Sequence, residues 1–132
     1  MGSKVLDSSA LVAYFEGEAS GAAVSQMLKE ASSKNKPLFI SVVNWGEVLC
    51  VTERRNDARK RDEVEKVMEQ MCLDVVSVDR NLTRAAAHIR ATQKLPYGDC
   101  FAAALALDKE AELVTKDKDF KSVEDKIHIQ WI

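Results

Sequence analysis

Short apolar runs and longer amphipathic segments alternate along the whole chain. The runs are too short for helices, and most lack the strict alternation of apolar and polar residues that marks a strand with one wet face. They therefore predict strands that are buried on both faces of a sheet. The predicted strands cover residues 3–7, 38–42, 73–78, 111–115 and 127–132.

The longer segments place apolar residues three or four positions apart, which is the spacing of one helical face. Ser8 or Ser9 is expected to cap the first helix, and Asp57 and Asp79 are expected to cap two later ones. The helix that follows Asp57 is predicted to turn inward the side chains of Val64, Val67, Met68 and Met71. The predicted helices cover residues 8–18, 20–34, 43–55, 58–71 and 80–93, and a last one begins at Pro96.

The order of these elements predicts the fold class. Apolar strands that are each followed by a helix favour an α/β fold with a parallel sheet covered on both faces. We therefore expect three layers, α/β/α, around a central, mostly parallel, five-stranded sheet. The 132 residues show no linker and no repeat, so a single domain over residues 1–132 is predicted.

Composition excludes several classes of protein. The net charge is −2, so no global basic field points to nucleic acid, although a local patch would be enough to bind it. The longest apolar run, residues 101–107, is too short to span a bilayer, and the first residues lack the apolar core of a signal peptide. Cys50, Cys72 and Cys100 are widely spaced without a C-x-x-C pair, which predicts reduced thiols in a cytoplasmic protein.

Acidic residues follow or face the carboxyl ends of several predicted strands. In parallel α/β sheets, ligands bind at this edge. Thr115, which ends a strand, offers a hydroxyl group at the same place. The acidic residues that map to this edge are Asp7, Glu47, Asp99 and Asp117, with Asp119 close by.

Like charges gathered at one edge repel each other. At about 5 Å and an effective dielectric constant near 20, each pair costs roughly 3 kcal/mol. A hard divalent cation relieves this repulsion, and oxygen ligands favour Mg²⁺ or Mn²⁺. Such a site suits metal-activated water that attacks a phosphodiester. Taken singly, however, Asp7 or Asp99 suits the start of a helix and Asp117 suits the cap of a turn.

Four motifs together carry a resemblance to a known family. They are VLDSSALVAYF at residues 5–15, ISVVNWGEVL at 40–49, LPYGDCFAAALAL at 95–107 and ELVTKDKDF at 112–120. In this order and at these separations they resemble PIN domains, and in particular the VapC ribonuclease toxins of type II toxin–antitoxin pairs. The resemblance extends over nearly the whole chain.

The resemblance implies a PIN-like fold and a Mg²⁺- or Mn²⁺-dependent endoribonuclease. It implies transfer or ribosomal RNA as the substrate, a cognate antitoxin protein as the inhibitor, and a homodimer. Asp7, Glu47, Asp99 and Asp117 match the acidic quartet of the family, with one or two metal ions. Asp119 matches a further acidic position that supports the site or replaces Asp117. The supporting hydroxyl positions correspond to Ser8 and Thr115.

Basic residues offer candidate contacts for RNA phosphates. Arg54 and Arg55 begin a basic cluster between two predicted helices, and Lys116 and Lys118 flank the acidic edge. The arginine cluster is better explained as a solvated loop, and the lysines are equally consistent with solvated surface.

Two other function classes remain as alternatives. A catalytically silent PIN-like module would bind RNA or protein without cutting, although the chain keeps all four carboxylates. A nucleotide-binding α/β module is disfavoured, because the turn after the first strand, LDSSAL, has no glycine-rich phosphate loop.

Overall fold

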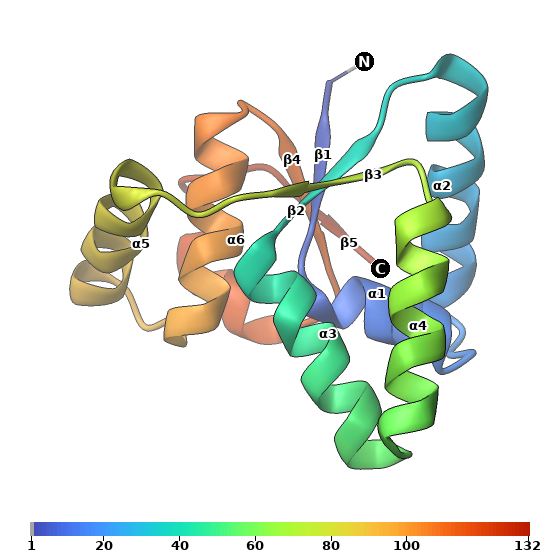
Figure 1. Ribbon diagram of the computed structural model, residues 1–132. Coiled ribbons are helices and arrows are strands. Elements are labelled where there is room, and N and C mark those ends of the chain that lie inside the picture. Colours follow the sequence, from blue (N-terminus) through green and yellow to red (C-terminus); the bar gives the residue numbers. More distant parts are fainter. Residues whose placement is uncertain (1) are drawn as a thin grey trace.

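The computed structural model describes residues 2–132. Five parallel strands form one sheet in the order β3-β2-β1-β4-β5 (Figure 1). The predicted five-stranded parallel sheet is therefore confirmed, and it is parallel throughout. The strands are β1 (Lys4–Leu6), β2 (Leu38–Ser41), β3 (Leu73–Val76), β4 (Glu112–Thr115) and β5 (Ile129–Trp131).

Helices connect the strands, as the sequence predicts. The last connection is a short 3₁₀ helix, which the sequence pattern did not indicate. The helices are α1 (Ser8–Phe15), α2 (Gly21–Lys34), α3 (Val42–Arg55), α4 (Ala58–Gln70), α5 (Arg80–Thr92) and α6 (Tyr97–Asp108), and the 3₁₀ helix η1 covers Lys118–Val123.

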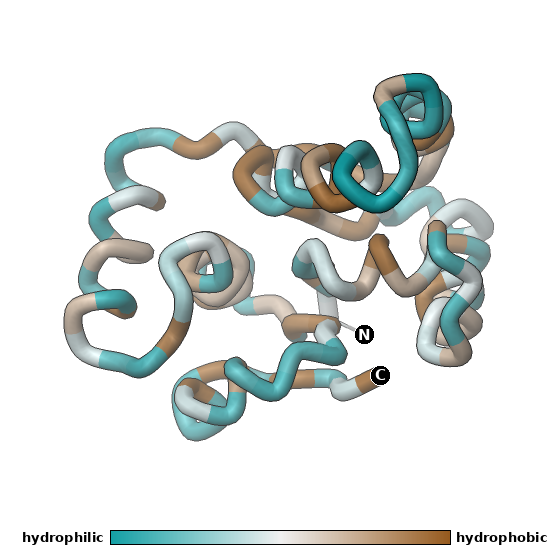
Figure 2. Tube along the Cα trace, turned by 90° about the horizontal axis from the view of Figure 1, so that it is seen from below, coloured by the Kyte–Doolittle hydropathy of each residue, from teal (hydrophilic) through white to brown (hydrophobic). Residues whose placement is uncertain are grey.

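Neighbouring residues of the central strands point to opposite faces of the sheet. Val5 and Leu113 belong to one hydrophobic cluster, which also contains buried residues of α5 and α6. Leu6 and Val114 belong to a second cluster, with buried residues of α1 to α4. Helices therefore cover both faces, and the tube in Figure 2 shows hydrophobic and hydrophilic residues alternating along them. This two-sided burial explains why the central strands are almost continuously apolar.

The order of the strands reverses at the centre of the sheet. The chain runs outward from β1 through β2 to β3, and then returns to the other side of β1 to form β4 and β5. The point of reversal therefore lies between β1 and β4, which pair in register from Lys4 opposite Glu112 to Leu6 opposite Val114. Ligand sites of parallel α/β folds lie outside the carboxyl ends of the strands at such a point.

Two details differ from the sequence predictions. The side chain that caps α1 is Asp7, which accepts a hydrogen bond from the Ala10 amide, and not a serine. In α4, Val64 and Met68 are buried but Val67 is 43% exposed, because this helix packs along a narrow stripe. The predicted caps Asp57 and Asp79 are confirmed by bonds from backbone amides of their helices.

The three cysteines form no disulfide, as predicted. No helix within residues 2–132 is long and apolar enough to cross a membrane.

Candidate metal centre

Asp7 is held at the carboxyl end of β1 by three hydrogen-bond donors. Its backbone is extended, its side chain is 1% exposed, and it accepts a hydrogen bond of 3.0 Å from the Ala10 amide. The Thr115 hydroxyl donates to Oδ2 at 2.6 Å, and the Ser9 hydroxyl lies 2.8 Å from Oδ1. Burial nevertheless raises the pKa of Asp7 to about 6, against the lowering effect of these donors.

Thr115 and Ser9 join the ends of β1 and β4. Thr115 is fully buried, its Oγ1 accepts from the Asp117 amide at 2.9 Å, and it lies 3.2 Å from Ser9 Oγ. Ser9 also accepts a hydrogen bond from the Lys116 amide. The two hydroxyl groups therefore fix the Asp7 carboxylate relative to the loop that carries Asp117.

Asp99 lies in the first turn of α6 and is 8% exposed. Burial raises the pKa of Asp99 to about 8, with further contributions from the negative charges of Asp117, Asp7 and Glu47. A hydrogen bond between the Asp99 and Asp117 carboxyl groups also favours the protonated form. Four carboxyl groups from separate elements are therefore close enough to oppose one another's charge.

Asp117 and Asp119 enter from the segment after β4. The Asp117 side chain caps η1 by accepting a hydrogen bond of 2.9 Å from the Asp119 amide, so its predicted role as a turn cap is confirmed. One carboxylate oxygen from each of Asp99, Asp117 and Asp119 can lie within 4.8 Å of the other two. A cation placed among these oxygens would contact all three residues.

Glu47 approaches Asp99 from α3. Its Oε1 accepts a hydrogen bond of 2.8 Å from Asn44 Nδ2. Its Oε2 lies so close to Gly98 that a Cβ atom built on that glycine would be 2.4 Å away. The first turn of α6 thus presents Asp99 and also leaves room for Glu47.

The donor set fits a hard divalent cation. The side-chain ligand atoms are carboxylate oxygens, which Mg²⁺ and Mn²⁺ prefer. The raised pKa values of Asp7 and Asp99 show that the arrangement disfavours further negative charge, and a cation would offset this cost. A buried thiol, Cys100, follows Asp99 in the chain but donates to the Leu95 carbonyl instead.

Of the acidic residues singled out in the sequence, the structure places oxygens of Asp99, Asp117 and Asp119 within 4.8 Å of one another. Asp7 and Glu47 lie outside this closest group, although their charges act on Asp99, and Thr115 bonds Asp7. The serine that donates to Asp7 is Ser9, whereas the sequence comparison pointed to its neighbour, Ser8. Asn44 and Gly98 had no signal in the sequence, because their contacts join helices that are 54 residues apart. These two residues extend the candidate site beyond the carboxylates.

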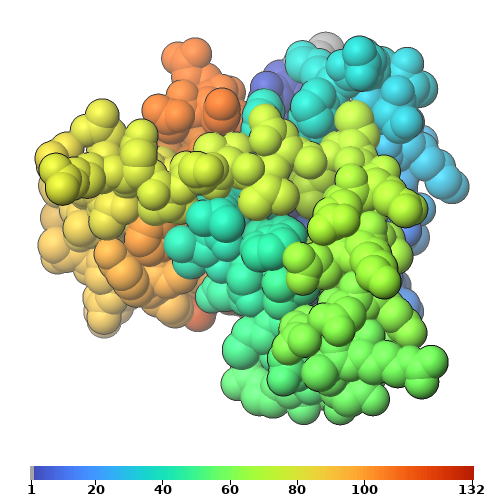
Figure 3. All heavy atoms as spheres, viewed as in Figure 1, coloured from blue at the N-terminus to red at the C-terminus, as the bar shows by residue number. Residues whose placement is uncertain are grey.

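The basic candidates lie in different surroundings. Arg55 forms an ion pair with Glu16, and Lys116 forms one with Glu18. Arg54 and Lys118 are exposed. The α3–α4 pair, whose tip carries Arg54 and Arg55, protrudes as the lower lobe in Figure 3.

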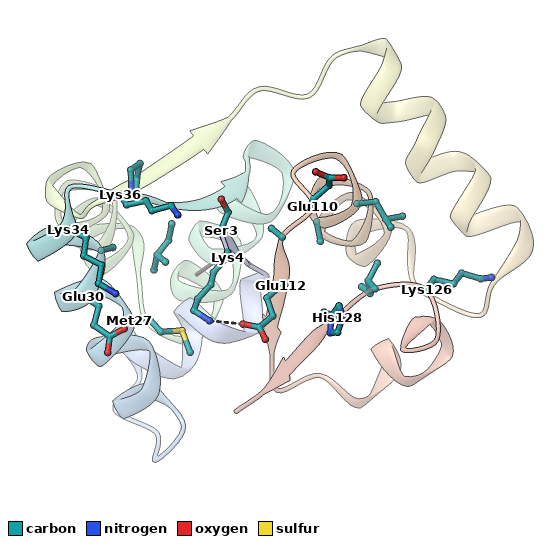
Figure 4. Close-up of a pocket in the computed structure, with 18 residues that line it drawn as sticks. Ser3, Lys4, Met27, Glu30, Lys34, Lys36, Glu110, Glu112, Lys126 and His128 are labelled. Atoms are coloured by element: carbon teal, nitrogen blue, oxygen red, sulfur yellow. Dashed lines mark hydrogen bonds and ion pairs between the residues drawn. The ribbon is translucent and has the colours of Figure 1, made fainter.

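A separate cavity of about 860 Å³ opens at the amino ends of the strands (Figure 4), the opposite edge of the sheet from the candidate metal centre. Its wall carries Lys4, which donates to Glu112 at 2.6 Å, with Lys34, Lys126 and His128 around it. Because these charges are mixed in sign and mostly exposed, the cavity does not form a second acidic centre.

Comparisons with known proteins agree with this fold. The family model of the PIN domain matches residues 4–126. A VapC ribonuclease of Mycobacterium bovis is 29% identical over 124 residues, covering 88% of this chain and 92% of that protein. VapBC2 of Rickettsia felis, solved bound to a DNA fragment from its promoter, is 17% identical with a TM-score of 0.75, covering 98% of each chain.

A further structural neighbour is VapC20 of Mycobacterium tuberculosis, described as a toxin that cleaves the sarcin–ricin loop. It is 18% identical with a TM-score of 0.74, covering 92% of this chain and 95% of its own. The match of the family model over most of the sequence places this chain in the PIN domain family. Within that family, the proteins to which it is similar include VapC ribonucleases and the toxins of VapBC pairs.

Proposed function

We propose that this chain is a divalent-metal-dependent endoribonuclease and the toxin of a type II toxin–antitoxin pair. The observation that carries the proposal is the group of carboxylates at the edge where the strand order reverses: oxygens of Asp99, Asp117 and Asp119 lie within 4.8 Å of one another. Asp7 and Glu47 lie near enough for their charges to raise the pKa of Asp99. Membership of the PIN family and similarity to VapC ribonucleases support it. The activity is assigned to one PIN-like domain over residues 1–132.

Asp7, Glu47, Asp99 and Asp117 would hold Mg²⁺ or Mn²⁺, with Asp119 as a further ligand or a replacement for Asp117. A bound divalent ion would lower the pKa of water and neutralise charge on the phosphoryl oxygens. Thr115 and Ser9 keep the Asp7 carboxylate in one orientation. The site presents carboxylates in place of a serine or cysteine nucleophile, which suits direct hydrolysis of a phosphodiester by water.

The partners follow from the same assignment. We propose transfer or ribosomal RNA as the substrate, contacted in part by Arg54, Arg55, Lys116 and Lys118. An antitoxin protein is the proposed inhibitor, because structural neighbours were solved as toxin–antitoxin complexes. A homodimer and a cytoplasmic location complete the proposal.

Asp99→Asn tests the activity. Asparagine resembles the protonated Asp99 that the raised pKa favours, so the fold should be retained. Because the variant loses a metal ligand, we expect cleavage of a small-RNA pool in Mn²⁺ to fall roughly 100- to 1,000-fold. Asp108→Asn, an exposed position at the other end of α6, is the matched control and should cleave normally.

Discrete fragments that disappear in EDTA and in Asp99→Asn would support the nuclease. Undiminished cleavage by folded Asp99→Asn would contradict it. Metal binding without cleavage of transfer or ribosomal RNA would instead favour the catalytically silent binding module.

A further inference from the structure

Asn44 is a fully buried polar residue in the first turn of α3, close to the carboxylates. Its side-chain Nδ2 donates one hydrogen bond of 2.8 Å to Glu47 Oε1 and a second of 3.1 Å to the Gly98 carbonyl. A carboxylate and a carbonyl can only accept, so both need a hydrogen-bond donor, and the two N–H groups of the Asn44 amide serve both. Asn44 therefore links the acidic residue of α3 to the first turn of α6.

The other half of the Asn44 side chain is fixed by Ser41. The Ser41 hydroxyl donates to Asn44 Oδ1 at 2.5 Å and accepts from the Asn44 amide at 3.1 Å. Ser41 is the last residue of β2, is itself fully buried, and caps α3. Ser41 at the end of β2 thus sets the orientation of the Asn44 side-chain amide, and this amide in turn orients the Glu47 carboxylate.

Gly98 completes the arrangement because it has no side chain. A Cβ atom there would lie 2.4 Å from Glu47 Oε2 and 3.1 Å from its Cδ, both closer than van der Waals contact allows. Any other residue would therefore push the Glu47 carboxylate away from the first turn of α6. The colliding atoms belong to the end of a flexible side chain, so a larger residue would displace Glu47 without disrupting the helix.

We propose that Asn44 and Gly98 are positioning residues, which hold the Glu47 carboxylate beside Asp99 before a metal ion binds. The inference rests on the proposed metal centre. Residues that orient a ligand through hydrogen bonds typically change metal affinity 10- to 100-fold when they are removed. The same carboxylate without these two constraints would have to be ordered at the moment of binding.

The decisive measurement is the Mn²⁺ affinity of the RNA-free protein, by titration calorimetry or electron paramagnetic resonance. We expect Gly98→Ala to weaken Mn²⁺ binding about tenfold or more, because the added methyl group displaces Glu47. Gly46→Ala is the matched control. It adds the same methyl group to a helical glycine next to Glu47, where nothing lies within 4 Å, so its affinity should equal that of the wild type.

Asn44→Leu removes the amide donors while keeping a side chain of similar size, and it should weaken Mn²⁺ binding by a similar factor. A purely structural role would lower stability and leave the Mn²⁺ affinity of the folded protein unchanged. In a Glu47→Gln background, Gly98→Ala should have little further effect, since the group that it displaces no longer carries a charge.

The outcomes separate the two proposals. If Asp99→Asn binds Mn²⁺ as tightly as the wild type, the metal centre itself is wrong. If Asp99→Asn loses binding while folded Gly98→Ala keeps wild-type affinity, the metal centre stands and the positioning role is overturned. A loss in Gly98→Ala that persists unchanged in the Glu47→Gln background would also overturn it.

Discussion

Asp7 and Asp99 are both buried carboxyl groups, but their surroundings prepare them differently for carrying charge. Asp7 receives hydrogen bonds from two hydroxyl groups and an amide, which partly offset its burial and leave its pKa at about 6. For Asp99 the hydrogen-bond partner is another carboxyl, Asp117, and its pKa rises to about 8. Asp7 is therefore the more firmly oriented anion, and the charge of Asp99 depends more on a cation.

Thr115→Val tests how far one hydroxyl group supports Asp7. The substitution keeps the shape of the fully buried side chain but removes its 2.6 Å hydrogen bond to Oδ2. We expect the free energy of unfolding at pH 7 to fall by about 1–3 kcal/mol, the cost of leaving a buried polar group unpaired. The pKa of Asp7, followed by carbon NMR in EDTA, should rise above its value in the wild type.

Thr115→Ser keeps the hydroxyl group and provides the control, which should leave the pKa of Asp7 close to that of the wild type. An unchanged pKa in Thr115→Val would show that the hydroxyl group does not support the Asp7 charge.

At this scale the sequence predicted the carboxylates better than the residues around them. Asp7 directly follows β1 and Asp117 comes two residues after β4, so the geometry of a parallel sheet brings them to the same edge whatever the side-chain details. Ser9, Asn44 and Gly98 take part through individual hydrogen bonds and a steric gap across distant segments. Such contacts have no periodicity, so they emerge only from the folded chain.

At the scale of elements, the short helix α1 depends on a close approach to α2. Gly21, the first residue of α2, is buried, and a Cβ atom there would lie 2.6 Å from the Ala13 carbonyl oxygen and 2.9 Å from the Tyr14 Cα. Both are backbone atoms of α1, so neither can move without shifting the helix. Because Asp7 caps the same helix, the packing of α2 helps to place the first carboxylate.

Gly21→Ala should therefore be destabilising, although alanine is the better helix former. We expect the free energy of unfolding to fall by about 1–3 kcal/mol, as is typical of overpacking, in urea titrations followed by circular dichroism. Gly46→Ala, which meets no atom within 4 Å, should be neutral or slightly stabilising. Equal stability of the two variants would contradict the close contact between α1 and α2.

The elements themselves were largely readable from the sequence, and the exceptions have local causes. Strands and helices followed from apolar runs and helical spacing, which the two-sided burial of the sheet imposes on the sequence. The 3₁₀ helix η1 is held by the Asp117 cap and the buried Phe120 and Val123, too short a pattern to show a period. Val67 follows the helical pattern but lies outside the narrow stripe along which α4 packs.

At the scale of the whole molecule, the fold gathers negative charge that destabilises it without a cation. The sheet and three helical segments converge on one edge, so the carboxyl groups cannot separate unless the chain unfolds. In the unfolded chain the same groups have ordinary pKa values near 3.8. Folding and ion binding are therefore linked through the protons on Asp7 and Asp99.

This linkage predicts that the protein in EDTA becomes less stable as the pH rises from about 4 to 8. Both aspartates have raised pKa values in the folded state, so across this window the folded chain binds more protons than the unfolded one, and raising the pH favours unfolding. Urea titrations at several pH values measure the slope. In Asp99→Asn the contribution of Asp99 disappears, while that of Asp7 remains and fades as the pH rises above 6. The stability of the variant should therefore be nearly independent of pH between 7 and 8, where the wild type still loses stability.

Mn²⁺ should oppose the same trend, because it binds the deprotonated carboxylates of the folded protein and raises stability most at the higher pH. The gain in wild-type stability on adding Mn²⁺ is therefore expected to be larger at pH 8 than at pH 5, and to be small in Asp99→Asn at both. A pH slope in EDTA that is the same in Asp99→Asn and the wild type would show that Asp99 does not carry the linkage. A gain from Mn²⁺ that is independent of pH would show that the ion binds away from these protonated carboxyl groups.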